Sequence, residues 1–68
     1  MARLLVVEDE VDLQEVLAYN LRRAGHEVVA ALRGHEGLRL ARETRPALIL
    51  LDLMLPDLPG TEVCRALK

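Results

Sequence analysis

Carboxylates follow two strongly apolar segments of this chain. Asp52 comes directly after the run at 48–51 (LILL), and the acidic run at 8–10 (EDE) comes directly after the run at 4–7 (LLVV). An apolar run of this length with polar residues at its end is typical of a strand that is covered on both faces of a sheet. Neighbouring carboxylates repel one another, and a site that gathers them normally holds a cation. The sequence therefore predicts a cation site where two buried strands end.

Three helices are predicted between and after the strands. Apolar residues recur at helical spacing over residues 11–24. Gly34 breaks the chain before a second, shorter helix, which ends near Arg45 because Pro46 disfavours helical geometry in the residue before it. A third helix starts at Thr61, where apolar residues again follow at helical spacing.

A further strand at 28–31 completes an alternation of strands and helices. This order predicts an α/β fold, with parallel strands joined by right-handed crossovers. In open sheets of this kind, functional groups gather beyond the carboxyl ends of the strands, which is where the acids at 8–9 and Asp52 fall. Asp57 and Glu10 are more typical of loop and cap residues than of metal ligands.

The composition excludes several classes of function. Nine basic and eleven acidic residues give a net charge of -2, which provides no electrostatic footprint for nucleic acid. The first apolar run is too short for a signal peptide or a membrane span, so we expect a cytoplasmic chain without membrane contact.

Cys64 is the only cysteine and is expected to be a buried, reduced thiol. His26 and His35 are expected to be exposed, because neither has the neighbours of a metal site.

The two strand-end motifs together resemble a known family. The stretches 4–10 (LLVVEDE) and 48–60 (LILLDLMLPDLPG) are similar to the receiver domain of bacterial two-component response regulators. Segments 17–21 and 60–65 are most similar to the OmpR/PhoB class, whose members have a winged-helix DNA-binding output domain. The resemblance spans the whole chain and implies a flavodoxin-like (CheY-like) parallel sheet. It also implies that residues 1–68 are the N-terminal part of a receiver domain, with no second domain in the chain.

The resemblance also implies a chemistry. Asp52 would accept a phosphoryl group from a sensor histidine kinase, with Mg²⁺ bridging the acceptor carboxylate and the incoming phosphoryl oxygens. Asp9 would bind the metal directly, Glu8 weakly or through a water, and Met54 through its backbone carbonyl. The domain would be a phosphoacceptor switch and not an enzyme. It would control transcription through a DNA-binding output domain outside this chain.

A second hypothesis belongs to a different class. The last helix has no stop signal before Lys68, so we expect the chain to be a fragment of a longer protein. The fragment could itself be the working species, a truncated α/β interaction module that self-associates and performs no phosphotransfer. The strand order of the family, second-first-third, would leave the apolar strand at 48–51 as an open edge. Such an edge favours pairing with another chain, so we expect self-association through this strand.

Overall fold

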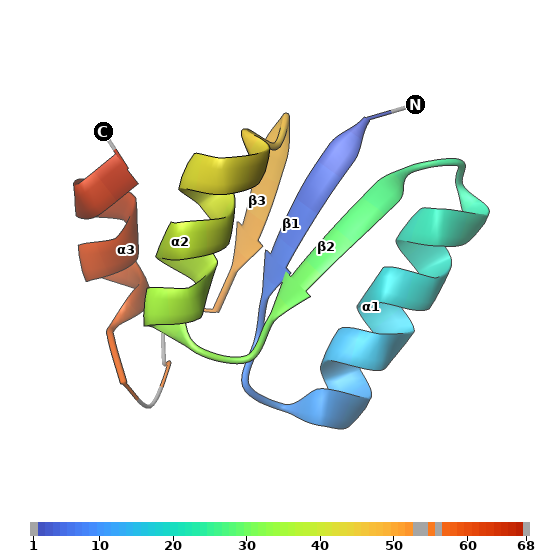
Figure 1. The fold of residues 1–68 in the computed structure, drawn as a ribbon. Coiled ribbons are helices and arrows are strands. Elements are labelled where there is room, and N and C mark those ends of the chain that lie inside the picture. The colour runs from blue at the N-terminus through green and yellow to red at the C-terminus, as the bar shows by residue number, and fades with distance from the viewer. Residues whose placement is uncertain (1, 53–54, 56, 68) are drawn as a thin grey trace.

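The computed structural model describes residues 2–52, 55 and 57–67. Six elements follow one another along the chain (Figure 1): β1 (Arg3–Val7), α1 (Val11–Arg23), β2 (Glu27–Ala31), α2 (Gly34–Thr44), β3 (Leu48–Leu51) and α3 (Gly60–Leu67). The strands form a parallel sheet in the order β2-β1-β3. The predicted α/β class and the second-first-third order of the strands are therefore confirmed.

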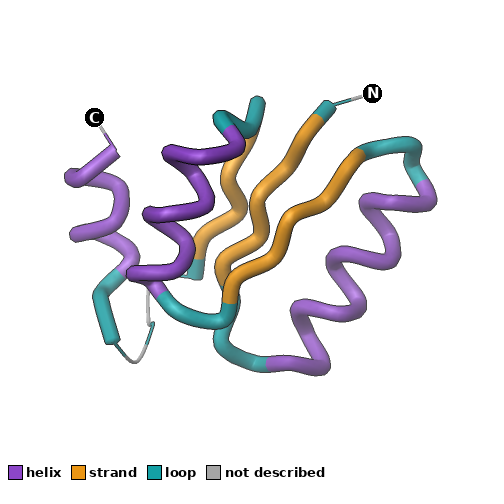
Figure 2. Tube along the Cα trace, viewed as in Figure 1, coloured by secondary structure: helices purple, strands orange, loops and turns teal. Residues whose placement is uncertain are grey.

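The helices lie on two faces of the sheet, as right-handed crossovers on either side of a central strand require. Helix α1 covers one face, and α2 and α3 lie together on the other (Figures 1 and 2). Successive side chains of a strand point to opposite faces. Leu5 and Val7 of β1 accordingly belong to the core on the side of α2 and α3, where Leu38 of α2 and Val63 of α3 meet them.

The face covered by α1 is less complete. Ala18 is the buried residue of this helix, whereas Val16 is 56% exposed and Tyr19 is 59% exposed. Strand β3 lies at the edge of the described sheet, and its first residue, Leu48, is 54% exposed. The apolar surface of the described residues is therefore concentrated on α1 and at the start of β3.

Helix α2 begins earlier than the sequence predicts. Gly34 was expected to break the chain before this helix, but it is the first helical residue. The backbone N–H groups of Gly34 and His35 donate hydrogen bonds to the side chain of Asp57, which comes from a distant part of the sequence. Local spacing could not reveal an acceptor that lies so far along the chain.

Cys64 and His26 also differ from expectation. Cys64 is exposed, because the preceding residue, Val63, faces the core and the helical turn directs Cys64 away from it. His26 is half-buried, and its Nδ1 accepts a hydrogen bond from the backbone N–H of Ala2 at 3.3 Å. His35 is exposed, as predicted. Within the part of the chain that the structure describes, no helix is both long and apolar enough to cross a membrane.

Candidate functional site

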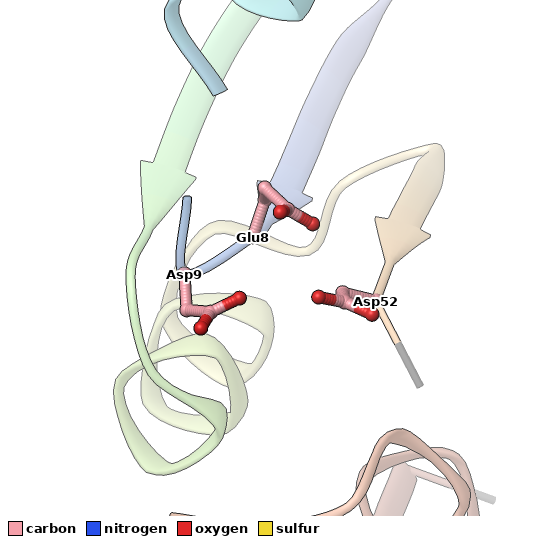
Figure 3. Close-up of side chains that lie close together, drawn as sticks. All are labelled: Glu8, Asp9 and Asp52. Atoms are coloured by element: carbon pink, nitrogen blue, oxygen red, sulfur yellow. The ribbon is translucent and has the colours of Figure 1, made fainter. Parts of the chain in front are cut away.

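Strands β1 and β3 end side by side and bring three carboxylates together. Val7 pairs with Leu51 in the parallel ladder, and the N–H of Asp52 donates to the Val7 carbonyl at 3.0 Å. The residues that follow the two strands therefore share one edge of the sheet. Figure 3 shows the side chains of Glu8, Asp9 and Asp52 converging there. One carboxylate oxygen from each of them lies within 4.8 Å of the other two.

The three carboxylates have different degrees of exposure. Glu8 is buried, with 8% of its surface exposed, whereas Asp52 is half-buried and Asp9 is exposed. Glu8 is fixed through its backbone, because its N–H donates to the Ala31 carbonyl of β2 at 3.1 Å. One Glu8 oxygen, Oε1, accepts the N–H of Glu10 at 3.3 Å. Asp9 is thus the member of the cluster that solvent reaches most readily.

The surroundings of Glu8 disfavour its charged form. Burial raises the pKa of the Glu8 carboxyl above its ordinary value. The hydrogen bond from the Glu10 N–H opposes this effect, while the charge of Asp52, a hydrogen bond with the Asp52 side chain and the charge of Asp9 raise the pKa further. A raised pKa at a group of converging carboxylates is the electrostatic condition that a bound cation relieves.

Gln14 supports the acidic edge, although no motif in the sequence predicts this role. Its Nε2 donates to the carbonyl of Ala31 at 2.7 Å and to that of Glu8 at 3.2 Å. One amide group therefore links α1 to the ends of β1 and β2. Gln14 lies four residues before Ala18, the buried residue of α1, and this helical spacing is the sequence signal that could have identified it, because an amide on the packed face of a helix needs partners.

Leu55 is the described residue that comes next after Asp52, and it lies in the core. Leu55 is 7% exposed and packs in the same cluster as Val63 of α3 and Leu38 of α2. Met54, the predicted source of a backbone carbonyl ligand, lies outside the described residues. The structure thus brings together three of the four predicted site residues, Glu8, Asp9 and Asp52.

The donor set of this edge fits a small divalent cation. All three side chains offer carboxylate oxygens, and hard cations such as Mg²⁺ prefer oxygen ligands. Mg²⁺ in proteins usually binds one or two carboxylates and keeps several waters. An exposed Asp9 beside a half-buried Asp52 leaves a solvent-facing side for such waters. The residues present are therefore compatible with Mg²⁺.

Comparison with known proteins places this chain in a family. Residues 4–68 match the model of the response regulator receiver domain. The chain is 47% identical over 68 residues to the transcriptional regulatory protein AfsQ1 of Streptomyces coelicolor, covering 100% of this chain and 30% of that protein. It is 47% identical over 66 residues to the alkaline phosphatase synthesis transcriptional regulatory protein PhoP of Bacillus subtilis, covering 97% of this chain and 28% of that protein.

A solved structure gives the same result for the fold. The response regulator protein TrrA of Thermotoga maritima, in complex with Mg²⁺-BeF, superimposes with a TM-score of 0.93 at 34% identity, covering 98% of this chain and 58% of that one. The flavodoxin-like, CheY-like fold implied by the resemblance is thereby confirmed. The chain spans less than a third of the curated relatives named above and just over half of the solved structure. It belongs to the response regulator receiver domain family.

Proposed function

We propose that Asp52 is a phosphoacceptor that takes a phosphoryl group from a sensor histidine kinase in the presence of Mg²⁺. The observation that carries this proposal is the convergence of Glu8, Asp9 and Asp52 at the carboxyl ends of two neighbouring parallel strands. Ligands of open α/β sheets bind at such an edge. Phosphoryl transfer needs positioning and charge neutralisation more than covalent assistance, which suits a site built from carboxylates and a cation.

In this proposal each side chain has a separate role. An oxygen of Asp52 forms a bond to phosphorus while the bond between phosphorus and the imidazole nitrogen of the donor breaks. Asp9 holds the cation directly, and buried Glu8 interacts with it weakly or through a water. When bound, Mg²⁺ supplies the positive charge that offsets repulsion between the acceptor carboxylate and the phosphoryl oxygens. A Met54 carbonyl ligand remains part of the proposal, outside the described residues.

The comparisons support the cellular role that we propose. AfsQ1 and PhoP are named as transcriptional regulatory proteins, and TrrA was solved in complex with Mg²⁺-BeF. We therefore propose that residues 1–68 are the N-terminal part of a cytoplasmic receiver domain that acts as a switch and not as an enzyme. Contact with DNA would be made only by an output domain outside these residues.

The test is the intact mass of the full chain after incubation with acetyl phosphate, with Mg²⁺ or with a chelator. We expect the mass of one phosphoryl group to be added only when Mg²⁺ is present. Asp52→Ala should lose the addition completely, because the acceptor oxygen is gone. Asp12→Ala, which removes an exposed acid from the first turn of α1, is the matched control and should be phosphorylated normally. Equal phosphorylation of the Asp52→Ala chain would refute the assignment.

One observation favours the second candidate function, self-association. Strand β3 lies at the edge of the described sheet, and Leu48 at its start is 54% exposed. An exposed apolar edge is a template for pairing with another strand. We expect the chain to sediment as a species larger than a monomer, and Leu48→Lys to shift it toward the monomer. A monomer at all concentrations would remove this candidate.

A further inference from the structure

The outer side of α1 carries a row of three side chains at helical spacing. Glu15, Tyr19 and Arg23 lie four residues apart, so they form one of the ridges through which helices pack against one another. All three are exposed, and Tyr19 is 59% exposed although it is the only aromatic residue of the chain. Figure 1 shows α1 on its own face of the sheet, away from α2 and α3. The ridge is therefore open to solvent.

The centre of this ridge is apolar. Val16, one turn before Tyr19, is 56% exposed, and the guanidinium of Arg23 lies over the Tyr19 ring at 5.7 Å from its centroid. A hollow of about 780 Å³ lies beside the ridge, and the small side chains of Ala18 and Ala30 help to line it. Solvent-facing positions of a helix are normally polar, and an aromatic side chain beside a hollow is typical of the centre of an interface. The ridge therefore has the character of a contact surface.

The two ends of the ridge carry opposite charges that cannot meet within one chain. Glu15 and Arg23 are eight residues apart, which is about 12 Å along the helix axis. On α2, by contrast, Arg39 pairs with Glu43 of the same helix at 2.9 Å. Neither Glu15 nor Arg23 forms an ion pair with another residue of the described part of the chain. Both charges are therefore available to a second molecule.

A second copy of the chain complements this ridge when its α1 runs antiparallel to the first. If the two Tyr19 residues meet, Glu15 of each copy faces Arg23 of the other, because both lie four residues from Tyr19. A two-fold axis through the Tyr19 pair then forms both ion pairs at once, as a symmetric dimer requires. Each charge lies about 6 Å along the helix from this axis, so the pairs form even where the two helices cross at an angle. A parallel arrangement would place Glu15 against Glu15.

We infer that the ridge of Glu15, Tyr19 and Arg23 is the surface through which two copies of this chain form a weak, antiparallel α1 dimer. A single helix of 13 residues offers a small contact area, and small interfaces of this kind are transient. The inference goes beyond the proposed function, because the contact needs neither Mg²⁺ nor phosphorylation. It also differs from association through β3. The hollow beside the ridge is lined by Ala30 of β2, and β2 and β3 lie on opposite sides of β1.

Reversal of the charge at either end of the ridge tests the pairing. Glu15→Arg changes the net charge from -2 to 0, and Arg23→Glu changes it from -2 to -4. Either change places like charges against one another at both ends of the dimer. Because two exposed ion pairs become repulsions, we expect the dissociation constant to rise at least about tenfold. Sedimentation equilibrium of the full chain over a range of concentrations measures it. The fluorescence of Tyr19 reports the contact itself, since the chain has no other aromatic residue.

An equal mixture of the two single variants should restore the dimer. In the mixture, the Glu15→Arg chain has basic residues at both ends of the ridge, and the Arg23→Glu chain has acidic residues at both ends. A mixed dimer therefore regains both ion pairs. Each chain still carries its own altered helix, so the restored association cannot result from repair of α1. The double variant, Glu15→Arg with Arg23→Glu, keeps the net charge of -2 and should dimerise as the parent does.

Arg42→Glu is the matched control for Arg23→Glu. Both residues are exposed arginines in the last turn of a helix, but Arg42 belongs to α2, on the other face of the sheet. The two changes give the same net charge, and the Arg42→Glu chain should dimerise as the parent does. Glu15→Arg separates pairing from net charge, because a net charge of 0 on its own promotes association. Leu48→Lys should leave the concentration dependence of the Tyr19 signal unchanged, since β3 is not part of this contact.

Three results would overturn the inference. A parent chain that stays monomeric at all concentrations would show that the ridge does not bind a second copy. Equal dimerisation of the Arg23→Glu and Arg42→Glu chains would show that the charge at position 23 takes no part in the contact. A mixture of the two single variants that associates no better than either variant alone would show that Glu15 of one copy does not pair with Arg23 of the other.

Discussion

The two acidic regions of this molecule surround their carboxylates in opposite ways. At the carboxyl ends of β1 and β3, the oxygens of Glu8, Asp9 and Asp52 lie within 4.8 Å of one another. At the first turn of α2, Asp57 accepts two backbone N–H groups at 2.8 Å and 3.1 Å. The first arrangement places negative charges side by side, whereas the second places one negative charge at the positive end of a helix.

The difference appears in the pKa values of the two regions. The pKa of Glu8 is raised, first by burial and then by the charges around it, and the pKa of Asp57 is lowered by its hydrogen bonds from Gly34 and His35. Asp57 is stabilised as an anion by the fold itself. Glu8 is destabilised as an anion, so the fold alone does not account for an acid at this position. Comparing the two regions separates a carboxylate whose charge the fold stabilises from carboxylates whose charges repel one another.

The largest effect is expected from Asp9→Asn. The change removes the most exposed charge of the acidic cluster while keeping the size of the side chain, so Mg²⁺ affinity should fall by more than the roughly 10- to 100-fold that is lost when a residue beside a metal ligand is changed. Without Mg²⁺ the same change should raise the unfolding midpoint, because it removes repulsion from Glu8 and Asp52. Asp57→Ala is expected to lower the midpoint, so the two acidic regions should respond with opposite signs.

Titration calorimetry and denaturant unfolding in the presence of a chelator measure both effects. Asp12→Asn is the control, because it removes one negative charge at a helix N-terminus outside the cluster. A stabilising effect of Asp9→Asn without Mg²⁺ that Asp12→Asn does not share would confirm the comparison. A destabilising effect of Asp9→Asn would contradict it, since the cluster would then be held together by contacts that do not involve repulsion.

The acidic cluster could be predicted from the sequence because its geometry follows from the class of fold. Once the runs before Glu8 and before Asp52 are identified as parallel strands, their carboxyl ends must share an edge of the sheet. The different burial of Glu8 and Asp9 could not be predicted. It depends on how the chain leaves β1. The N–H of Glu8 still continues the ladder to the Ala31 carbonyl, whereas the next residue, Asp9, is exposed.

The sequence predicts that Asp57 is a loop or cap residue, which is confirmed, but it does not predict that the helix capped is α2. Sequence signals for helix starts are local, and the residue before this helix is Arg33, which is a poor cap. The acceptor, Asp57, lies 23 residues beyond the donor, Gly34, in the chain. Because the sequence around Gly34 contains no acceptor for the first N–H groups of α2, it predicts a start after Gly34, whereas the helix begins at Gly34. The bounds of β3 were predicted correctly. Pro-Ala precedes the apolar run and an acid follows it, which leaves little choice in where the strand begins and ends.

The smallest effect is a difference in pH dependence between the two regions, and Asp57 gives the first half of it. Its pKa in the folded chain is below its ordinary value of 3.8, so the charged form favours folding. This contribution is present above the unfolded pKa and is lost as the pH falls through the folded pKa. The stability advantage of the parent over Asp57→Ala should therefore be constant near neutral pH and decrease below about pH 4. His35 faces Asp57 and is left unchanged in both chains.

Glu8 should give a slope of the opposite sign, because its folded pKa lies above the ordinary value of 4.5. An acid of this kind favours folding below its unfolded pKa, and that contribution is lost as the pH rises through the folded pKa. In the presence of a chelator, Glu8→Gln should therefore become more stable relative to the parent as the pH rises above 4.5. Denaturant unfolding of both variants and the parent across this range measures the two slopes. Slopes of the same sign would mean that the fold stabilises the charged form of both acids. The distinction between the two acidic regions would then fail.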